Sequence, residues 1–360
     1  MKIHNFNPGP AVLPPEALRL AQEEWSDFAG TGMSVMEVSH RSPACQELFT
    51  ETEQLLRQLL GVPDGYHVLF LQGGASLQFG MVPMNFLGEG KSADYILTGS
   101  WSQKALKEAR IVGEARVAAT TEEDNFRRLP KPAEIKLDPG AAYVHITSNN
   151  TIVGTQHHYW PETGEIPLIA DMSSDILGRQ FDVSKFGLVY AGAQKNLGPA
   201  GVTTVIIRDD MLERCPDGLP SMLDYRTHAK AGSLYNTPPV WCVYMMRNVL
   251  LWLKSIGGLR EIEQRNRAKA RLVYRCVDRY PKMFIGHAEP GSRSVMNITF
   301  RLPTEELEQA FLEKAKTEGL IGLKGHRSVG GCRASLYSAL PLESAQVLAA
   351  FMEEFATSHG

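Results

Sequence analysis

Residues 187–207 read GLVYAGAQKNLGPAGVTTVII, and residues 166–171 read IPLIAD. Both stretches contain short apolar runs of the kind that forms buried strands. The upstream run ends at Asp171, and the turn between the two downstream runs carries Lys195. An ionised side chain at the end of a buried strand is unfavourable unless it is paired or used. Asp171 and Lys195 are therefore a structural ion pair, two solvated loop residues, or the centre of a site.

Strand and helix patterns alternate on either side of this pair. We expect strands at residues 66–72, 94–98, 142–147, 168–171, 188–191 and 202–207. We expect helices at residues 15–28, 43–60, 77–86 and 101–112. Short apolar strands separated by helices or loops predict an α/β fold with a mostly parallel sheet that is covered on both faces.

The pattern changes near Gly257-Gly258. Residues 241–256 and 259–279 predict a long helical connector. Beyond it we expect strands at 295–300 and 333–337, and helices at 304–318 and 342–357. The sequence thus predicts an N-terminal arm (1–15), a large domain (16–257) and a smaller α+β C-terminal domain (258–360).

Composition narrows the functional classes. The 360 residues are 43% hydrophobic and carry a net charge of −3, which gives no support for a nucleic-acid or membrane-surface partner. The most apolar long stretch, residues 240–256, is too short and too charged to span a bilayer. The five cysteines are scattered without metal-ligand spacing, so we expect reduced thiols, a cytoplasmic protein and no metal site.

Polar residues gather where the predicted strands end. In an open α/β sheet, ligands bind beyond the carboxyl ends of the strands. Ala75 and Ser76 begin a helix and would offer backbone N–H groups to a phosphate, and Trp101 could stack on a flat ring. A lysine can form a Schiff base with an aldehyde cofactor, and an acid can keep a ring nitrogen protonated. Together these features predict a pyridoxal 5′-phosphate site around Lys195 and Asp171.

Basic residues in loops indicate an anionic substrate. His40-Arg41 and His326-Arg327 lie in Gly/Ser/Pro-rich segments, and Arg333 opens a strand. Arginine binds carboxylates and phosphates through paired hydrogen bonds. Two such pairs and an additional arginine predict a substrate with more than one anionic group.

The chain resembles the phosphoserine aminotransferase family, a class V, fold-type I group of pyridoxal-phosphate enzymes. The motifs that carry the resemblance run from end to end: Asn5–Pro10, Ser39–Ser42, Phe70–Gly74, Ala191–Asn196, Tyr235–Pro239 and Gly325–Arg333. The resemblance implies a seven-stranded type of sheet in the large domain. It also implies amino transfer between glutamate and 3-phosphohydroxypyruvate in serine biosynthesis, and leaves open a second role in pyridoxine biosynthesis.

The resemblance also implies roles for individual residues. Lys195 would form the Schiff base and act in catalysis, with Asp171 at the pyridinium nitrogen, Trp101 on the ring and Thr151 bonded to the cofactor. The cofactor phosphate would be held by Ala75, Ser76 and Gln194, and by Asn236 and Thr237 of a neighbouring subunit, in a homodimer with shared active sites. Arg41 and Arg333 would bind the substrate carboxylate, and His40, His326 and Arg327 its phosphate.

Some observations leave other functions open. Some family members have Gly-Arg where this chain has Ala75-Ser76, so an arginine contribution to the phosphate site is absent. Cys332 beside Arg333 would suit a cysteine desulfurase, although a small residue at the start of a buried strand accounts for it better. The remaining alternatives are a class V enzyme for unphosphorylated amino or oxo acids, and a non-catalytic binding protein.

Overall fold

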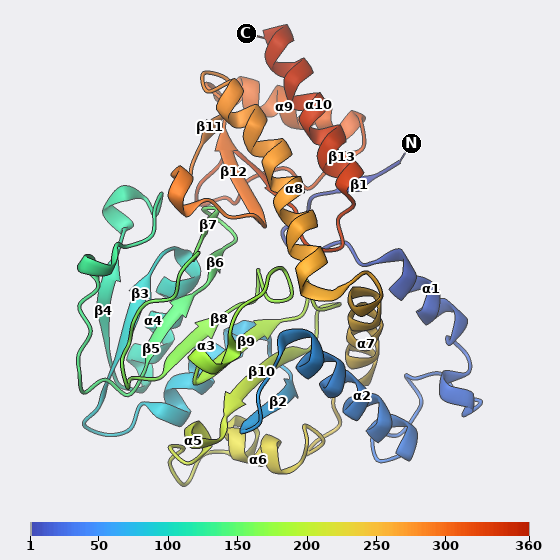
Figure 1. The fold of residues 1–360 in the computed structure, drawn as a ribbon, viewed down its shortest axis with the longest axis vertical. Coiled ribbons are helices and arrows are strands. Elements are labelled where there is room, and N and C mark those ends of the chain that lie inside the picture. Colours follow the sequence, from blue (N-terminus) through green and yellow to red (C-terminus); the bar gives the residue numbers. More distant parts are fainter. Residues whose placement is uncertain (1, 360) are drawn as a thin grey trace.

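A seven-stranded sheet forms the centre of the protein (Figure 1). The computed structural model describes residues 2–359. The strand order is β2-β10-β9-β8-β5-β3-β4, and only β10 runs antiparallel to its neighbours. The strands are β2 (Tyr66–Leu71), β3 (Ser92–Leu97), β4 (Glu114–Thr120), β5 (Val144–Thr147), β8 (Leu168–Asp171), β9 (Leu188–Gly192) and β10 (Thr203–Arg208). The predicted α/β class and the mostly parallel sheet are confirmed.

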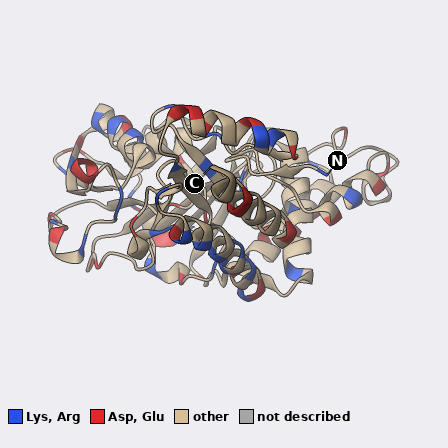
Figure 2. Cartoon of the chain, turned by 90° about the horizontal axis from the view of Figure 1, so that it is seen from above, with Lys and Arg blue, Asp and Glu red and all other residues tan. Residues whose placement is uncertain are grey.

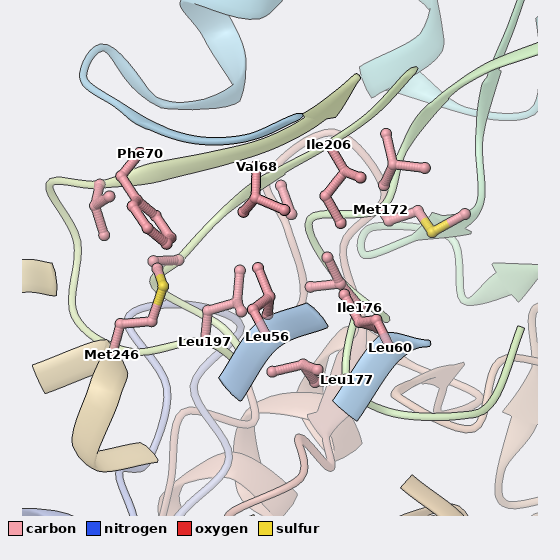
Figure 3. Packing of buried hydrophobic residues seen from close by; sticks show 14 of the residues in the cluster. Leu56, Leu60, Val68, Phe70, Met172, Ile176, Leu177, Leu197, Ile206 and Met246 are labelled. Carbon is pink, nitrogen blue, oxygen red and sulfur yellow. The ribbon is translucent and has the colours of Figure 1, made fainter. Parts of the chain in front are cut away.

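Helices cover both faces of this sheet because its strands are apolar on both sides. Val68 and Phe70 pack in one cluster with the first group of helices, and Leu69 and Leu71 pack in another with the second group. The first group is α1 (Pro15–Glu23), α2 (Pro43–Leu60), α7 (Val240–Ser255) and the start of α8 (Gly258–Arg279). The second group is α3 (Gly74–Phe86), α4 (Ser100–Val112), α5 (Asp209–Leu212) and α6 (Tyr225–Lys230). Figure 3 shows strand side chains meeting Leu56 and Met246 in the first cluster.

A smaller unit lies at the upper end of the molecule in Figure 1 and has its own core. Its antiparallel sheet contains β11 (Ile285–Gly286), β12 (Asn297–Arg301) and β14 (Cys332–Ser335). The second half of α8 packs there with α9 (Glu305–Thr317) and α10 (Leu342–His359). A strand near the N-terminus, β1 (His4–Asn5), pairs in parallel with β13 (Leu320–Ile321) and so attaches the N-terminal arm to this unit.

Helix limits follow local sequence signals in several places. The hydroxyl of Ser42 accepts the Cys45 N–H at 3.3 Å, Pro43 occupies the first turn of α2, and Gly61 ends the helix with φ 63°. These are the preferred residues at a helix start and end. The predicted range of α2 is therefore correct to the residue.

Other predicted limits were wrong. The first helix ends at Glu23 rather than residue 28, and α3 begins at Gly74, three residues before the predicted start at 77. The predicted connector is two helices, α7 and α8, separated at Gly257, whose φ is 106°. Strand β4 and the hairpin of β6 (Asn149–Asn150) and β7 (Thr155–Gln156) were not predicted at all. No helix within residues 2–359 is both long and apolar enough to cross a membrane.

Candidate active site

A cavity of about 300 Å³ opens beyond the carboxyl ends of β5, β8 and β9. The starts of α3 and α4 close one side, and the β14 strand of the smaller unit approaches from the other. Nine of the residues singled out from the sequence line it: Ala75, Ser76, Trp101, Thr151, Asp171, Gln194, Lys195, His326 and Arg333. Pockets of this size and position bind small molecules in α/β proteins.

Lys195 lies in the turn after β9 and points its amine into this cavity. Its Nζ donates to the Thr151 hydroxyl at 2.7 Å. Burial lowers the pKa of Lys195 to about 8, and the positive charge of Arg333 acts in the same direction, while Asp171 and Asp175 oppose the shift. A lysine with a lowered pKa has a larger neutral, nucleophilic fraction near pH 7.

Asp171 ends β8 and is 5% exposed. Its Oδ1 accepts the backbone N–H of Ser173 at 2.9 Å. Burial raises the pKa of Asp171, and the hydrogen bonds from Ser173 and the charge of Lys195 oppose that rise. A buried carboxylate of this kind favours a cationic partner in the cavity.

The start of α3 provides a binding site for an anion. Gly73 and Gly74 have φ values of 86° and 67°, which are unfavourable for residues with a side chain and let the chain turn sharply from β2 into the helix. No side chain caps α3, so its first backbone N–H groups are available to a ligand at the cavity wall. Trp101 adds a flat apolar surface and packs against Phe79 at 6.5 Å between ring centroids.

Arg333 and His326 bring positive charge to the same cavity. Arg333 is 5% exposed, and its Nη1 donates to the Thr151 carbonyl at 3.1 Å. Its buried Nε has no acceptor among the described residues, and burial lowers the pKa of the guanidinium. Burial lowers the pKa of His326, and the charge of Arg333 adds to that effect. A carboxylate in the cavity would satisfy the free Nε.

Five of the expected site residues lie outside this cavity in the single chain. Arg327 is exposed next to His326, and Arg41 is exposed at the start of α2. His40 and Thr237 line a second cavity of about 310 Å³, and the Asn236 amide donates to Gln72 Oε1 at 3.2 Å. Asn236 and Thr237, which we expected to act across a subunit boundary, thus do not line the Lys195 cavity of the single chain.

Two segments of the cavity wall were not expected from the sequence. Pro8 and Gly9 of the N-terminal arm line it, as do Ser173 and Ser174. Gly9 has φ 132°, and a Cβ there would lie 3.4 Å from Lys195 Cγ. The serines could have been found because they directly follow Asp171, whereas nothing in the local sequence places the arm beside Lys195.

Hydrogen bonds connect the Lys195 turn to the smaller unit. Asn196 Oδ1 accepts the Ser338 N–H at 2.9 Å, and its Nδ2 donates to the Ile176 carbonyl at 2.9 Å. Lys269 of α8 is 1% exposed and donates to the carbonyls of Tyr337 at 2.7 Å and Leu340 at 3.0 Å. The loop after β14 is therefore held against both α8 and the Lys195 turn.

Cys332 does not have the surroundings of a reactive thiol. It is fully buried at the start of β14, and burial raises its pKa. A nucleophilic cysteine requires an accessible, easily ionised thiol. The structure thus supports the packing role of Cys332.

Comparison with known proteins places this geometry in a family. The model of the class-V aminotransferases matches residues 3–348, and the chain belongs to that family. Within it, the chain belongs with the phosphoserine aminotransferases: it is 57% identical over 354 residues to the one from Geobacillus kaustophilus, with 98% of each chain covered.

Solved structures agree with this placement. The phosphoserine aminotransferase from Bacillus circulans subsp. alkalophilus superimposes with a TM-score of 0.98 at 54% identity, covering 100% of this chain and 99% of that one. A phosphoserine aminotransferase from Trichomonas vaginalis, described as PLP-bound, gives 0.94 at 39% identity, covering 98% of this chain and all of the other.

Proposed function

We propose that the protein transfers the amino group of glutamate to 3-phosphohydroxypyruvate and so forms O-phosphoserine and 2-oxoglutarate. The observation that carries this proposal is the arrangement of Lys195, Asp171 and Arg333 in one cavity, in a chain of this family. Lys195 has a lowered pKa, Asp171 is a buried acid, and Arg333 has a free donor. The cysteines of the protein are free thiols, which suits the cytosol, and we place the enzyme there.

The cavity offers partners for the phosphate, the ring and the ring nitrogen of pyridoxal 5′-phosphate. The uncapped start of α3 would hold the phosphate, Trp101 would lie on the ring, and Asp171 would face the ring nitrogen. When bound, the cofactor supplies an electron-withdrawing ring that stabilises negative charge at the substrate Cα. Asp171 would strengthen this effect by favouring a protonated nitrogen.

Two residues would act directly on the substrate. Arg333 would bind the carboxylate shared by amino and oxo acids, because its free Nε and its burial favour a charge-assisted hydrogen bond. The neutral amine of Lys195 would move a proton between the substrate Cα and C4′ of the cofactor. The nearby Thr151 hydroxyl, 2.7 Å from Nζ, would orient that amine.

We propose that the enzyme is a homodimer with active sites shared between subunits. His40 and Thr237 line a cavity that does not include Lys195, where they could serve a second subunit. Exposed apolar residues accompany them, including Met36 and Tyr235, which are 53% and 51% exposed. Burying such side chains is a driving force for association.

A substrate comparison tests the phosphate assignment. Arg327→Ala should reduce kcat/KM for 3-phosphohydroxypyruvate by roughly 30-fold or more, because a charge-assisted contact to phosphate is lost. The rate with glutamate should change much less. Arg333→Ala is the matched control and should impair both substrates. Equal kcat/KM for phosphorylated and unphosphorylated oxo acids in the unmutated enzyme would reject the proposed substrate.

Subunit mixing tests the shared site. A hybrid of Lys195→Ala and Thr237→Ala subunits would have one site with both defects and one with neither. Activity should therefore recover partially after subunit exchange between the two impaired dimers. If hybrids form but activity does not recover, each site is built from a single chain.

A further inference from the structure

A groove of about 910 Å³ lies beside α8, and none of its lining residues belongs to the catalytic cavity. It is about three times as large as that cavity. Its wall is formed largely by arginines: Arg267, Arg271, Arg275 and Arg279 from α8, and Arg293 from the segment before β12. Nothing in the proposed transamination uses this groove.

The four α8 arginines form a single stripe. They recur every four residues, which places them on one helix face about 6 Å apart along the axis and about 18 Å from first to last. Arg293 faces the stripe, bonded through two nitrogens to Asp278 at 2.8 and 2.6 Å. Its guanidinium also lies 4.4 Å from the Tyr274 ring centroid and is therefore held in place. Figure 2 shows blue bands of Lys and Arg along several helices of the protein.

Positive charge in the groove exceeds the nearby negative charge. Arg267 pairs with Glu263 at 2.8 Å, and Arg293 with Asp278. Arg275 and Arg279 share Glu353, at 3.9 and 3.6 Å. Arg271 has no carboxylate within 4.0 Å in the described part of the chain. The five guanidinium groups thus face three carboxylates, in a protein whose net charge is −3.

This arrangement is unfavourable for the helix on its own. Like charges four residues apart on a helix repel by a few tenths of a kcal/mol per pair. An anion that spans several turns would offset this repulsion, and guanidinium groups bind phosphate oxygens in pairs. One isolated phosphate would meet only part of the stripe. Arg293 already covers one face of the Tyr274 ring.

We propose that this groove binds a polyphosphate chain, either free or as the triphosphate of a nucleotide. The arginine stripe recognises the phosphates, and the nucleoside is not required. The site lies outside the catalytic cavity and binds its ligand whether or not substrate is present.

Calorimetric titration of the holoenzyme with tripolyphosphate, ATP and inorganic phosphate tests the proposal. Tripolyphosphate should bind saturably at one site per chain and more tightly than inorganic phosphate. Arg271→Gln/Arg275→Gln should weaken it by about tenfold or more, because two charge-assisted contacts are lost. The control is Arg260→Gln/Arg265→Gln, which removes the same charge from α8 at residues that do not line the groove. Circular dichroism would check that both double variants are folded.

The outcomes are distinct. ATP affinity equal to that of tripolyphosphate identifies a nucleotide as a suitable source, and binding of tripolyphosphate alone identifies free polyphosphate. Equal weakening in both double variants would mean general charge attraction and overturn the proposal. Absence of saturable binding, or displacement of tripolyphosphate by O-phosphoserine, would also overturn it.

Discussion

Replacing Lys195 by methionine should stabilise the cofactor-free protein at neutral pH. The lowering of the Lys195 pKa from 10.5 to about 8 means that its charged form is less stable in the folded protein by about 3 kcal/mol, even beside Asp171. Methionine has similar length and no charge. It loses the hydrogen bond to Thr151, which is worth about 1.5–3 kcal/mol. The variant should therefore be more stable than the wild type by about 1 kcal/mol at pH 7.

The pH dependence gives the more decisive test. Because the folded-state pKa is below the unfolded one, the unfolded protein binds more protons between pH 8 and 10.5, and wild-type stability rises with pH in that window. Between pH 7 and 9.5 the rise should be about 2 kcal/mol. The variant lacks this contribution, so it should become the less stable protein by about 1 kcal/mol at pH 9.5.

Urea denaturation at pH 7 and 9.5 measures the effect. Lys195→Met should have the higher free energy of unfolding at pH 7, and the wild type should have the higher one at pH 9.5. Lys254→Met is the control, because Lys254 is an exposed lysine on α7 and the substitution removes the same charge without changing a buried site. A difference for Lys195→Met that is the same at both pH values would show that burial of the ammonium group does not destabilise the fold.

Three further changes test other parts of the structure. Asp171→Asn should preserve the fold but lower the single-turnover rate by orders of magnitude, because an amide does not favour a protonated ring nitrogen; a near wild-type rate would make Asp171 structural. Gly154→Ala should lower the free energy of unfolding more than Gly30→Ala. The two glycines have similar φ values (76° and 70°), but only at Gly154 would the added Cβ lie 2.8 Å from a backbone oxygen. Equal losses in urea denaturation would contradict this. Lys269→Met should change the free energy of unfolding by less than the two lost hydrogen bonds alone would, because the loss of the donor to buried carbonyls is offset by removal of an amine whose pKa burial lowers to about 7; a loss above about 3 kcal/mol in urea denaturation at pH 7 would show that the hydrogen bonds dominate.

The sequence predicted the fold best where a local signal and a buried pattern agree. Ser42, Pro43 and Gly61 mark α2 without help from the rest of the chain. Strand β4 has no comparable signal. It is an edge strand of sequence EARVAAT, in which alanines and charged residues favour strands weakly, and its pairing with β3 stabilises it. Tertiary contacts, not local preference, determine such elements.

In the candidate site, too, some residues could be predicted from the local sequence and others depend on tertiary contacts. Residues at strand ends, such as Asp171, Thr151 and Lys195, could be grouped because parallel strands place their carboxyl ends at one edge. Pro8 and Gly9 could not, since only the pairing of β1 with β13 and the path of the arm bring them to Lys195.

The attachment of the N-terminal arm has a mechanical consequence. The arm is bonded to the smaller unit through β1 and through the Tyr337 hydroxyl, which donates to the Pro8 carbonyl at 2.9 Å. Arg333 belongs to the same unit. A rotation of that unit toward the central sheet would therefore carry Arg333 and the Pro8–Gly9 segment over Lys195 together. Arg333 and the Pro8–Gly9 segment would then move as one body, and the cavity would narrow from two sides in a single motion.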